Sequence, residues 1–258
     1  HAHRPYTTNH TTHNKTSSKD VHTRHNTRRN AINTKLLLLA LATPMQYAHA
    51  ARAARQARIL STGSAAPARK VPNADLEAIV DTSDEWISKR TGIRQRHLLA
   101  PDESLSQIAA TAARNALAAS TIEPLDIDLV LLATSSPDDL FGDAAHVARQ
   151  IGATNAVAFD LTAACSGFLF GVNTAAQFLH TGAYRNAVVI GADALSRWVD
   201  WSDRNTCVLF GDGAGAVVMT RAESEAESGL LGFEMHSNGA GRADLNLGYA
   251  GSERELAT

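Results

Sequence analysis

The chain has only two cysteines in 258 residues, Cys165 and Cys207. Two cysteines cannot form the disulfide framework of a small secreted protein, and the sequence contains neither a Cys-x-x-Cys pair nor a His-Glu-x-x-His motif. Seven of the 11 histidines lie within the first 57 residues, and the spacing of zinc ligands is missing throughout. We therefore expect no metal site.

Long hydrophobic runs are also missing. The apolar run within residues 35–50 is too short to span a bilayer, and no other candidate follows it. No repeat of the length typical of solenoids or propellers is visible. We expect neither a membrane nor a nucleic acid as partner. With 44% hydrophobic residues, the chain can form one large domain or two smaller ones.

Acidic residues are almost missing from residues 1–57, which carry nine Lys and Arg against the single acid Asp20. The apolar run in this segment ends in an Ala-x-Ala pattern, residues 48–50, and an Arg- and Ala-rich stretch follows, as in plastid or mitochondrial presequences. The alternative is an artefact of the gene prediction, because the chain begins with His and its first methionine is Met45. We interpret residues 1–57 as a disordered presequence or such an artefact.

From Arg58 onward, strand-length apolar segments alternate with amphipathic helical ones, which predicts an α/β fold with mostly parallel strands. The polar segment 223–229 is the expected boundary between a first domain, 58–228, and the start of a second, 229–258. The helix that begins near Cys165 is apolar, which predicts that it lies between two sheets. The expected strands are 58–64, 127–135, 156–161, 186–195, 207–220 and 229–237, and the other expected helices are 73–80, 104–120, 144–153 and a short one from 82 that stops near Gly92.

Cys165 lies where an apolar strand runs into an apolar helix, within AFDLTAACSGF. A single cysteine in apolar surroundings is most often buried filler. Here small residues allow a tight turn, and the N-terminus of a helix favours the thiolate, which is the nucleophile. Ser166 and Gly167 leave room for a substrate. We therefore predict that Cys165 is a catalytic nucleophile, whereas Cys207, within an apolar strand, belongs to the core.

Four motifs, in this order, carry a family resemblance: DTSDEWISKRTGIRQRH, TAACSGF, GADALSRWVDWSDRNT and LFGDGAGAV. They resemble β-ketoacyl-acyl-carrier-protein synthase III, the condensing enzyme that initiates type II fatty-acid synthesis. SPDDLFGDA and GADALSRWVDW resemble the plastid enzymes of plants and algae most. The resemblance implies a thiolase fold with five α-β-α-β-α layers in a homodimer, in which 58–228 is the N-terminal half and 229–258 begins the C-terminal half.

The resemblance also implies the reaction, a decarboxylating Claisen condensation. Acetyl-CoA acylates Cys165, and malonyl-acyl-carrier-protein then loses carbon dioxide and attacks the acyl group to give acetoacetyl-acyl-carrier-protein. Acetyl-CoA is a substrate, and no cofactor is expected. The segment GDGAGA lacks the G-x-G-x-x-G spacing of a dinucleotide-binding loop, so NAD is not expected either.

Further residues take roles only through the resemblance. Trp86 and Arg204 would sandwich the adenine of coenzyme A by stacking and cation–π attraction. Thr82 would hydrogen-bond the edge of the adenine, and Arg90 would meet the phosphates. In the substrate pocket, Phe141 would line the acyl site, often across the dimer interface, and Phe210 would lie beside the cysteine.

The sequence departs from the family pattern at several points. Asn205 stands where a glycine usually follows the arginine, and His146 stands where another residue is more common. The family pattern continues well beyond Thr258, and that stretch holds the catalytic His and Asn and much of the surface that docks the acidic carrier protein. His236 and Asn238 do not replace that pair and are expected to be structural. We expect a C-terminally truncated chain that is inactive alone.

Two alternatives stay open at this point. One is a chalcone-synthase-like acyl-CoA polyketide synthase of the same superfamily, which GIRQRH and DWSDR disfavour. The other is a non-catalytic partner subunit with half of the fold, which the intact AACSGF disfavours.

The charge from Arg58 onward is negative, with 15 Lys and Arg against 25 acids. This charge is a poor match for an acidic carrier protein, so any basic docking patch is expected to be local or beyond Thr258. The presequence suggests the plastid stroma, with a bacterial-type cytoplasm as the alternative.

Overall fold

The computed structural model describes residues 57–222 and 229–248 of the chain. The expected presequence, except for its last residue Ala57, and most of the expected boundary segment 223–229 lie outside the described residues. Ala57 is buried and begins the first strand, so the folded part starts one residue earlier than expected. Within the described part, no helix is both long enough and apolar enough to cross a bilayer.

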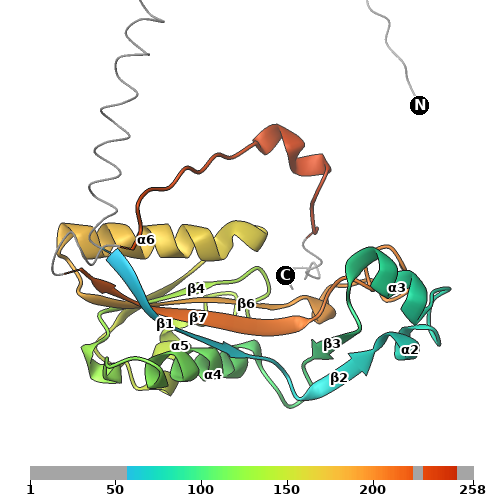
Figure 1. Ribbon diagram of the computed structural model, residues 1–258, viewed down its shortest axis with the longest axis horizontal. Helices are drawn as coiled ribbons and strands as arrows, with labels where there is room; N and C mark the ends of the chain where they lie inside the picture. The colour runs from blue at the N-terminus through green and yellow to red at the C-terminus, as the bar shows by residue number, and fades with distance from the viewer. Residues whose placement is uncertain (1–56, 223–228, 249–258) are drawn as a thin grey trace, which may run out of the picture. The chain divides into compact units, whose positions relative to one another are not determined.

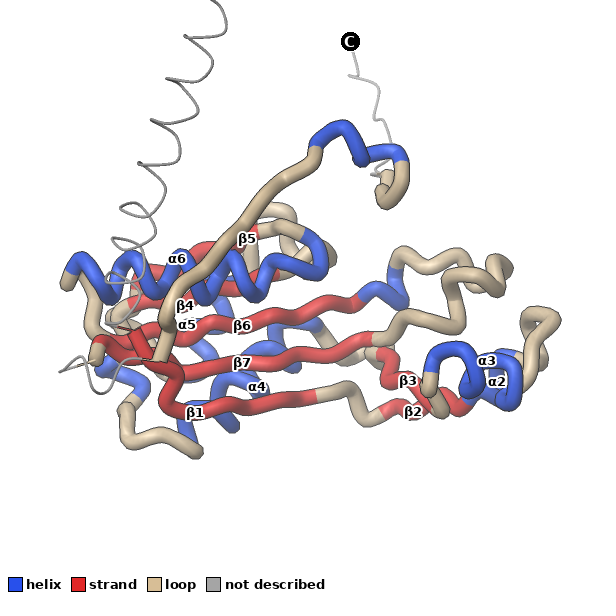
Figure 2. The backbone as a smooth tube through the Cα atoms, turned by 45° about the horizontal axis from the view of Figure 1, so that its top comes forward, coloured by secondary structure: helices blue, strands red, loops and turns tan. Residues whose placement is uncertain are grey.

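Five strands form one mixed sheet in the order β1-β7-β6-β4-β5 (Figure 2). β4 pairs in parallel with β5 and with β6, whereas β7 is antiparallel to both β6 and β1. The expected α/β fold is confirmed, but the expectation of mostly parallel strands is wrong. The chain passes from β6 to β7 without an α-helix, so β7 returns beside β6 in the opposite direction. The strands are β1 (Ala57–Ala65), β4 (Leu129–Ala133), β5 (Val157–Leu161), β6 (Asn186–Ala194) and β7 (Asp212–Arg221).

Helices cover both faces of this sheet (Figure 1). α4 (Leu105–Ala118) and α5 (Ala144–Ile151) pack on one face, and α6 (Gly167–Thr181) packs on the other. The second sheet that was expected on the far side of α6 is not among the described residues, and Leu169 on α6 is 61% exposed. The described residues therefore form three α-β-α layers.

β4 is the most deeply buried strand, with all five residues in the core. Its side chains alternate between the two faces: Val130 and Leu132 join the cluster beneath α4 and α5, and Leu129 and Leu131 join the cluster beneath α6. The continuous apolar run in the sequence is what a strand covered on both faces requires. The strand expected within 127–135 is thus confirmed.

α4 lies unusually close to the edge strand β1. The helix begins at a capping box in which Ser104 Oγ accepts the N–H of Gln107 and the Gln107 side chain accepts the N–H of Ser104. Its sheet-facing side is alanine, so the two backbones can approach closely. Ser61 Oγ in β1 donates to Ala116 O over 2.6 Å, and an added Cβ at Gly63 would lie 2.3 Å from Ala116 N. This contact leaves no room for any side chain at Gly63.

A two-stranded hairpin lies beyond the end of the main sheet (Figure 1). It pairs β2 (Arg69–Pro72) with β3 (Gln95–Leu98) in antiparallel register, and its connection contains α2 (Asn73–Leu76) and α3 (Asp84–Thr91). α3 carries the predicted coenzyme residues Trp86 and Arg90. The hairpin therefore sets where these two residues lie relative to the main sheet.

The ends of α2 and α3 test two expectations. α3 stops at Gly92, which has φ of 75°, a conformation that glycine adopts without strain, so the expected stop is confirmed. The helix expected over 73–80 is only a single turn, with Pro72 as its N-cap and Asn73 as its first residue. The Asn73 side chain is committed to tertiary hydrogen bonds.

One expected strand, 207–220, is present but starts later than expected, and another, 229–237, is absent from the described residues. Cys207 lies in a turn rather than in a strand, although it is fully buried as expected, and β7 begins only at Asp212. Residues 229–237 form no strand, and Leu231 is exposed. A strand needs a neighbour that pairs with its N–H and C=O groups. Among the described strands only β1 meets this segment, where Gly229 N and Leu230 N donate to Ala57 O, and no ladder continues from there. The apolar pattern alone therefore does not make it a strand.

Candidate active site

Cys165 lies on a short 3₁₀ turn, η2 (Ala164–Ser166), between the end of β5 and the start of α6. The expected strand-to-helix junction is thus present, and the Cys165 side chain is exposed. Ser166, the N-cap of α6, makes no side-chain capping hydrogen bond. The positive end of the α6 dipole therefore lies directly after the thiol, where it favours negative charge.

The turn that carries Cys165 is strained and tightly held. Ala164 has φ of 46°, the only positive φ of a non-glycine residue among the described residues, which costs about 1–3 kcal/mol. A Cβ on Gly167 would lie 3.2 Å from Ala133 Cβ, so the start of α6 is pressed against β4. The close packing of α6 offsets the strain and directs the thiol away from the core.

The Cys165 side chain opens onto a cavity of about 310 Å³. Its opposite wall comes from the start of β7 and the residues before it, where Gly211, Gly213 and Gly215 line the space. Glycines without side chains leave room beside the thiol, which suits a flat acyl thioester better than a bulky ligand. The GDGAGA segment therefore serves as a cavity wall.

Asp193 is the single carboxylate lining this cavity among the described residues. Its Oδ1 accepts hydrogen bonds from Ser135 N over 2.8 Å and from Ser136 Oγ over 2.9 Å. Ser136 Oγ in turn accepts the N–H of Ala194 over 2.7 Å. The carboxylate thus holds the segment that follows β4 to the end of β6. Sequence reasoning missed Asp193, because a single acid within an apolar strand gave no signal of its own.

The predicted coenzyme residues come together from two elements: Trp86 and Arg90 lie on α3, and Arg204 lies on a turn far along the chain. The guanidinium carbon of Arg90 lies 4.3 Å from the centroid of the Trp86 ring, and that of Arg204 lies 4.4 Å from it. Arg204 also contacts Asp81 over 3.4 Å. An adenine between Trp86 and Arg204 needs two stacking contacts of about 3.5 Å each. Arg204 must therefore move away from Trp86 before a base can enter.

Thr82 lies just before α3 and is half-buried. Its Oγ1 is buried and has no hydrogen-bond partner among the described residues. A buried hydroxyl without a partner costs stability, about 1–3 kcal/mol, so it is a group that a ligand could satisfy once the oxygen becomes accessible.

The two predicted pocket phenylalanines lie at different places. Phe210 is half-buried and directly precedes Gly211, which lines the Cys165 cavity. Phe141 is fully exposed, at 101%, and lines a separate cavity of about 540 Å³ beside β5. Within one chain, Phe141 therefore does not line the cavity of Cys165.

His236 and Asn238 do not line the cavity either. His236 is exposed and its Nε2 lies 2.9 Å from Glu234 Oε1, while Asn238 Oδ1 accepts the N–H of Ala240. Both side chains thus have local partners. Among the described residues, no group of three or more His, Cys, Asp and Glu is arranged to hold a metal ion.

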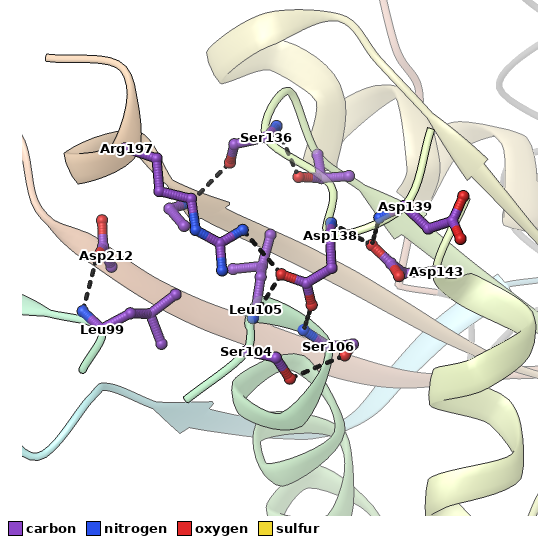
Figure 3. Close-up of polar contacts among 12 residues, drawn as sticks. Leu99, Ser104, Leu105, Ser106, Ser136, Asp138, Asp139, Asp143, Arg197 and Asp212 are labelled. Carbon is purple, nitrogen blue, oxygen red and sulfur yellow. Dashed lines mark hydrogen bonds and ion pairs between the residues drawn. The ribbon is translucent and has the colours of Figure 1, made fainter. Parts of the chain in front are cut away.

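Carboxylates in the loop that follows β4 hold this loop to the start of α4 (Figure 3). Asp138 accepts the N–H of Leu105 over 3.1 Å and that of Ser106 over 2.8 Å at the start of α4, and it pairs with Arg197 over 2.8 Å. Burial acts to raise the pKa of Asp138, but the hydrogen bonds from Ser106, Arg197 and Leu105 outweigh burial and hold the pKa below its usual value.

Asp143 lies beside Asp138 and behaves in the opposite way. It accepts the N–H of Asp138 over 2.6 Å and is almost fully buried. Burial raises the pKa of Asp143, the hydrogen bonds from Asp138 and Asp139 oppose the shift, and the charges of Asp138 and Asp160 add to it.

The two carboxylates predict stability changes of opposite sign with pH. An Asp side chain in the unfolded chain has a pKa of about 3.9, and above that pH ionised Asp138 contributes its full stabilisation. The stabilisation is lost as the pH falls through the lower pKa of Asp138 in the folded protein. We expect Asp138→Asn to cost about 1–2 kcal/mol at pH 7 and progressively less below about pH 4. Ionised Asp143 costs stability until the pH falls through its raised pKa, so Asp143→Asn should be neutral or stabilising at pH 7.

Urea unfolding of both variants and wild type between pH 3 and pH 7 checks this pair. Asp143→Asn is the matched control, because it removes a charge from the same loop. Equal losses of stability for the two variants at pH 7 would contradict the assignment.

Comparison with known proteins places these features in a family context. Residues 159–239 match the family model described as 3-oxoacyl-[acyl-carrier-protein (ACP)] synthase III. The β-ketoacyl-[acyl-carrier-protein] synthase III of the cyanobacterium Microcystis aeruginosa is 61% identical over 198 residues, which are 77% of this chain and 59% of that protein. The chain spans about three fifths of the length of the curated relatives that it matches.

Solved structures agree with the sequence matches. The 3-oxoacyl-(acyl carrier protein) synthase III of Pseudomonas aeruginosa gives a TM-score of 0.67 at 41% identity, covering 72% of this chain and 56% of that one. The enzyme of the same name from Aquifex aeolicus gives a TM-score of 0.63 at 47% identity, covering 65% and 55%. The described residues thus have a thiolase-like α/β fold that spans about half of the solved chains, and over that part the chain is similar in sequence and structure to 3-oxoacyl-acyl-carrier-protein synthase III.

Proposed function

We propose that this chain belongs to a condensing enzyme that initiates type II fatty-acid synthesis. Acetyl-CoA and malonyl-acyl-carrier-protein would give acetoacetyl-acyl-carrier-protein, coenzyme A and carbon dioxide. One observation carries the proposal: the exposed Cys165 lies on a strained turn at the start of α6 and faces a cavity walled by glycines. The similarity to synthase III enzymes of known name supports the same reaction.

The proposed reaction has two half-reactions at Cys165. Its thiolate attacks the carbonyl carbon of acetyl-CoA, the bond from that carbon to the coenzyme sulfur breaks, and coenzyme A leaves. Malonyl-acyl-carrier-protein then loses carbon dioxide, which leaves an electron pair on its α-carbon, and this carbon attacks the acetyl group and releases Cys165. The strained turn presents the thiol beside the start of α6 in both half-reactions.

Trp86, Arg90 and Arg204 would bind the nucleotide part of coenzyme A. Their close grouping supports this role, since two guanidinium groups and an indole ring offer both cation–π stacking and charge for the phosphates. Binding would draw Arg204 off the Trp86 ring and break its exposed contact with Asp81, which costs little. Thr82 would then offer its hydroxyl to the edge of the base.

The decisive experiment follows the acetyl group. The full-length protein is incubated with radiolabelled acetyl-CoA, digested, and the labelled peptide is identified by mass spectrometry. We expect the label on the peptide that contains Cys165, and its transfer to acetoacetyl-acyl-carrier-protein when malonyl-acyl-carrier-protein is added. Chain extension from malonyl-CoA instead would favour the polyketide synthase alternative. A protein that stays unlabelled would favour the non-catalytic partner subunit.

The β5 edge supports a homodimer. β5 pairs only with β4 among the described strands, and Val157 and Phe159 on it are exposed, as is the neighbouring Phe141. Such an apolar edge is normally covered in the native assembly. Sedimentation analysis of the full-length protein should show a dimer, and a stable monomer at micromolar concentration would overturn this part.

The acid-poor segment 1–57 supports a location in the plastid stroma, whereas the cyanobacterial relatives fit the bacterial-type cytoplasm. Residues 1–57 fused to a fluorescent protein should carry it into plastids of plant or algal cells. Fluorescence that stays in the cytosol would point to the bacterial-type alternative.

A further inference from the structure

Arg96 in β3 is a buried arginine that the proposed reaction does not use, with only 5% of its surface exposed. Its guanidinium donates to three uncharged acceptors: Val71 O over 3.1 Å, Asn73 Oδ1 over 2.6 Å and Val208 O over 3.3 Å. Burying a charged guanidinium that has only neutral hydrogen-bond acceptors is costly. A protein with an apolar side chain of similar size at such a position is often equally stable. Fold stability alone is therefore a weak reason for an arginine at this position.

One arm of the Arg96 network leads to α3. Asn73 accepts from Arg96 through Oδ1, and its Nδ2 donates to Asp84 Oδ1 over 2.8 Å and to Ile93 O over 2.7 Å. Asp84 is the first residue of α3 and lies two residues before Trp86. Every hydrogen-bonding atom of the buried Asn73 amide group is thus used to connect Arg96 with both ends of α3.

The other arm leads to the turn that carries Arg204. Val208, which accepts from Arg96, is buried and directly follows Cys207, whose N–H closes the turn by donating to Asp203 O over 3.0 Å. The same segment touches β3 a second time, because a Cβ on Gly211 would lie 3.0 Å from Arg96 Cβ. β3 therefore holds the 203–211 segment at two points.

We propose that Arg96 is a positioning residue for the adenine site, which sets the spacing between α3, which carries Trp86, and the 203–208 turn, which carries Arg204. The inference rests on the proposed function of Trp86 and Arg204. An adenine stacked between Trp86 and Arg204 needs these two groups at a fixed separation. Because they belong to segments far apart in the sequence, another contact must hold the two segments in place. Arg96 bridges them through Asn73 and Val208, and it does not itself touch the nucleotide.

The test compares two acetyl donors in the full-length protein. Acetyl-CoA carries the adenine nucleotide, whereas acetyl-pantetheine offers the same thioester without it. In Arg96→Met, we expect the KM for acetyl-CoA to rise by about tenfold or more, with kcat little changed, because misplacing a binding group by about an ångström has effects of this order. The kcat/KM for acetyl-pantetheine should stay unchanged. Arg69→Met, an exposed arginine on the paired strand β2, is the matched control and should change neither value.

A second variant guards against a folding defect. Arg96→Lys keeps the charge but reaches fewer acceptors, so it should give an intermediate rise in the KM for acetyl-CoA. Equal losses with both donors would reduce Arg96 to a structural role and overturn the inference. So would an unchanged KM in Arg96→Met.

Calorimetric binding of coenzyme A separates this inference from the proposed function. If Arg96→Met binds coenzyme A as tightly as wild type does, the positioning role is wrong and the proposed function still stands. If wild type neither binds coenzyme A nor accepts the acetyl group of acetyl-CoA, the proposed function is wrong.

Discussion

Replacing Gly63 with alanine should destabilise the full-length protein by about 3 kcal/mol, because the added methyl group would overlap the backbone of α4. It would lie 2.3 Å from both Ala112 O and Ala116 N. These atoms belong to the backbone of α4, so a rotamer change cannot relieve the clash. The helix itself is fixed by the Ser61 hydrogen bond to Ala116 O and by that of Asn115 Nδ2 to Ser64 O. Relief therefore requires the whole of α4 to move off β1.

Thermal and urea unfolding measure this effect, with a fall in Tm on the order of 10 °C. Gly215→Ala is the matched control, since Gly215 pairs with Ser64 in the adjacent strand and an added Cβ there meets nothing within 4 Å. A loss below about 1 kcal/mol for Gly63→Ala would show that α4 and β1 can separate cheaply. It would contradict the close approach described for this pair.

Replacing Cys165 with alanine should abolish acetylation and lower condensation by at least about a thousandfold, because the nucleophile is lost. The Cys207→Ala variant should still be acetylated at Cys165 and should keep most of the condensation activity. Cys207 is fully buried, and burial first, then the charge of Asp203, raises the pKa of its thiol. A buried, protonated thiol is a poor nucleophile. The chain's two cysteines thus offer an internal comparison between an exposed and a buried thiol.

Labelling with radioactive acetyl-CoA and a condensation assay check this pair of variants in the full-length protein. Circular dichroism should show that both variants are folded. If Cys165→Ala carried as much label as wild type, or if Cys207→Ala alone lost it, the assignment of the nucleophile would be wrong.

Local features of the fold could be predicted from the sequence. The helix that begins after Ser104 and the stop at Gly92 depend on capping and on backbone conformation within a few residues, and both are present. The fully apolar β4 and the junction before α6 were also predictable, since burial on two faces and a change of hydrophobic period leave direct marks in the sequence.

Part of the candidate site was predictable and part was not. Cys165 was singled out by its place at a helix start. Trp86 and Arg204 were named only through the family resemblance, and sequence spacing gave no reason to join them. Arg96 was passed over, because an arginine in a basic segment such as GIRQRH normally points into water. Its burial depends on a hairpin, on α3 and on a turn that meet only in the folded chain.

By itself the sequence determined the α/β class, most helix ends, the doubly buried β4 and the position of Cys165 at the start of α6. Only the tertiary structure decided that β7 runs antiparallel between β6 and β1, that residues 229–237 form no strand, and that Trp86 meets Arg204. The physical reason is the range of the interactions. Caps and periodicity act within one or two turns of chain, whereas strand order, ladder partners and buried polar networks depend on segments that become neighbours only when the core closes.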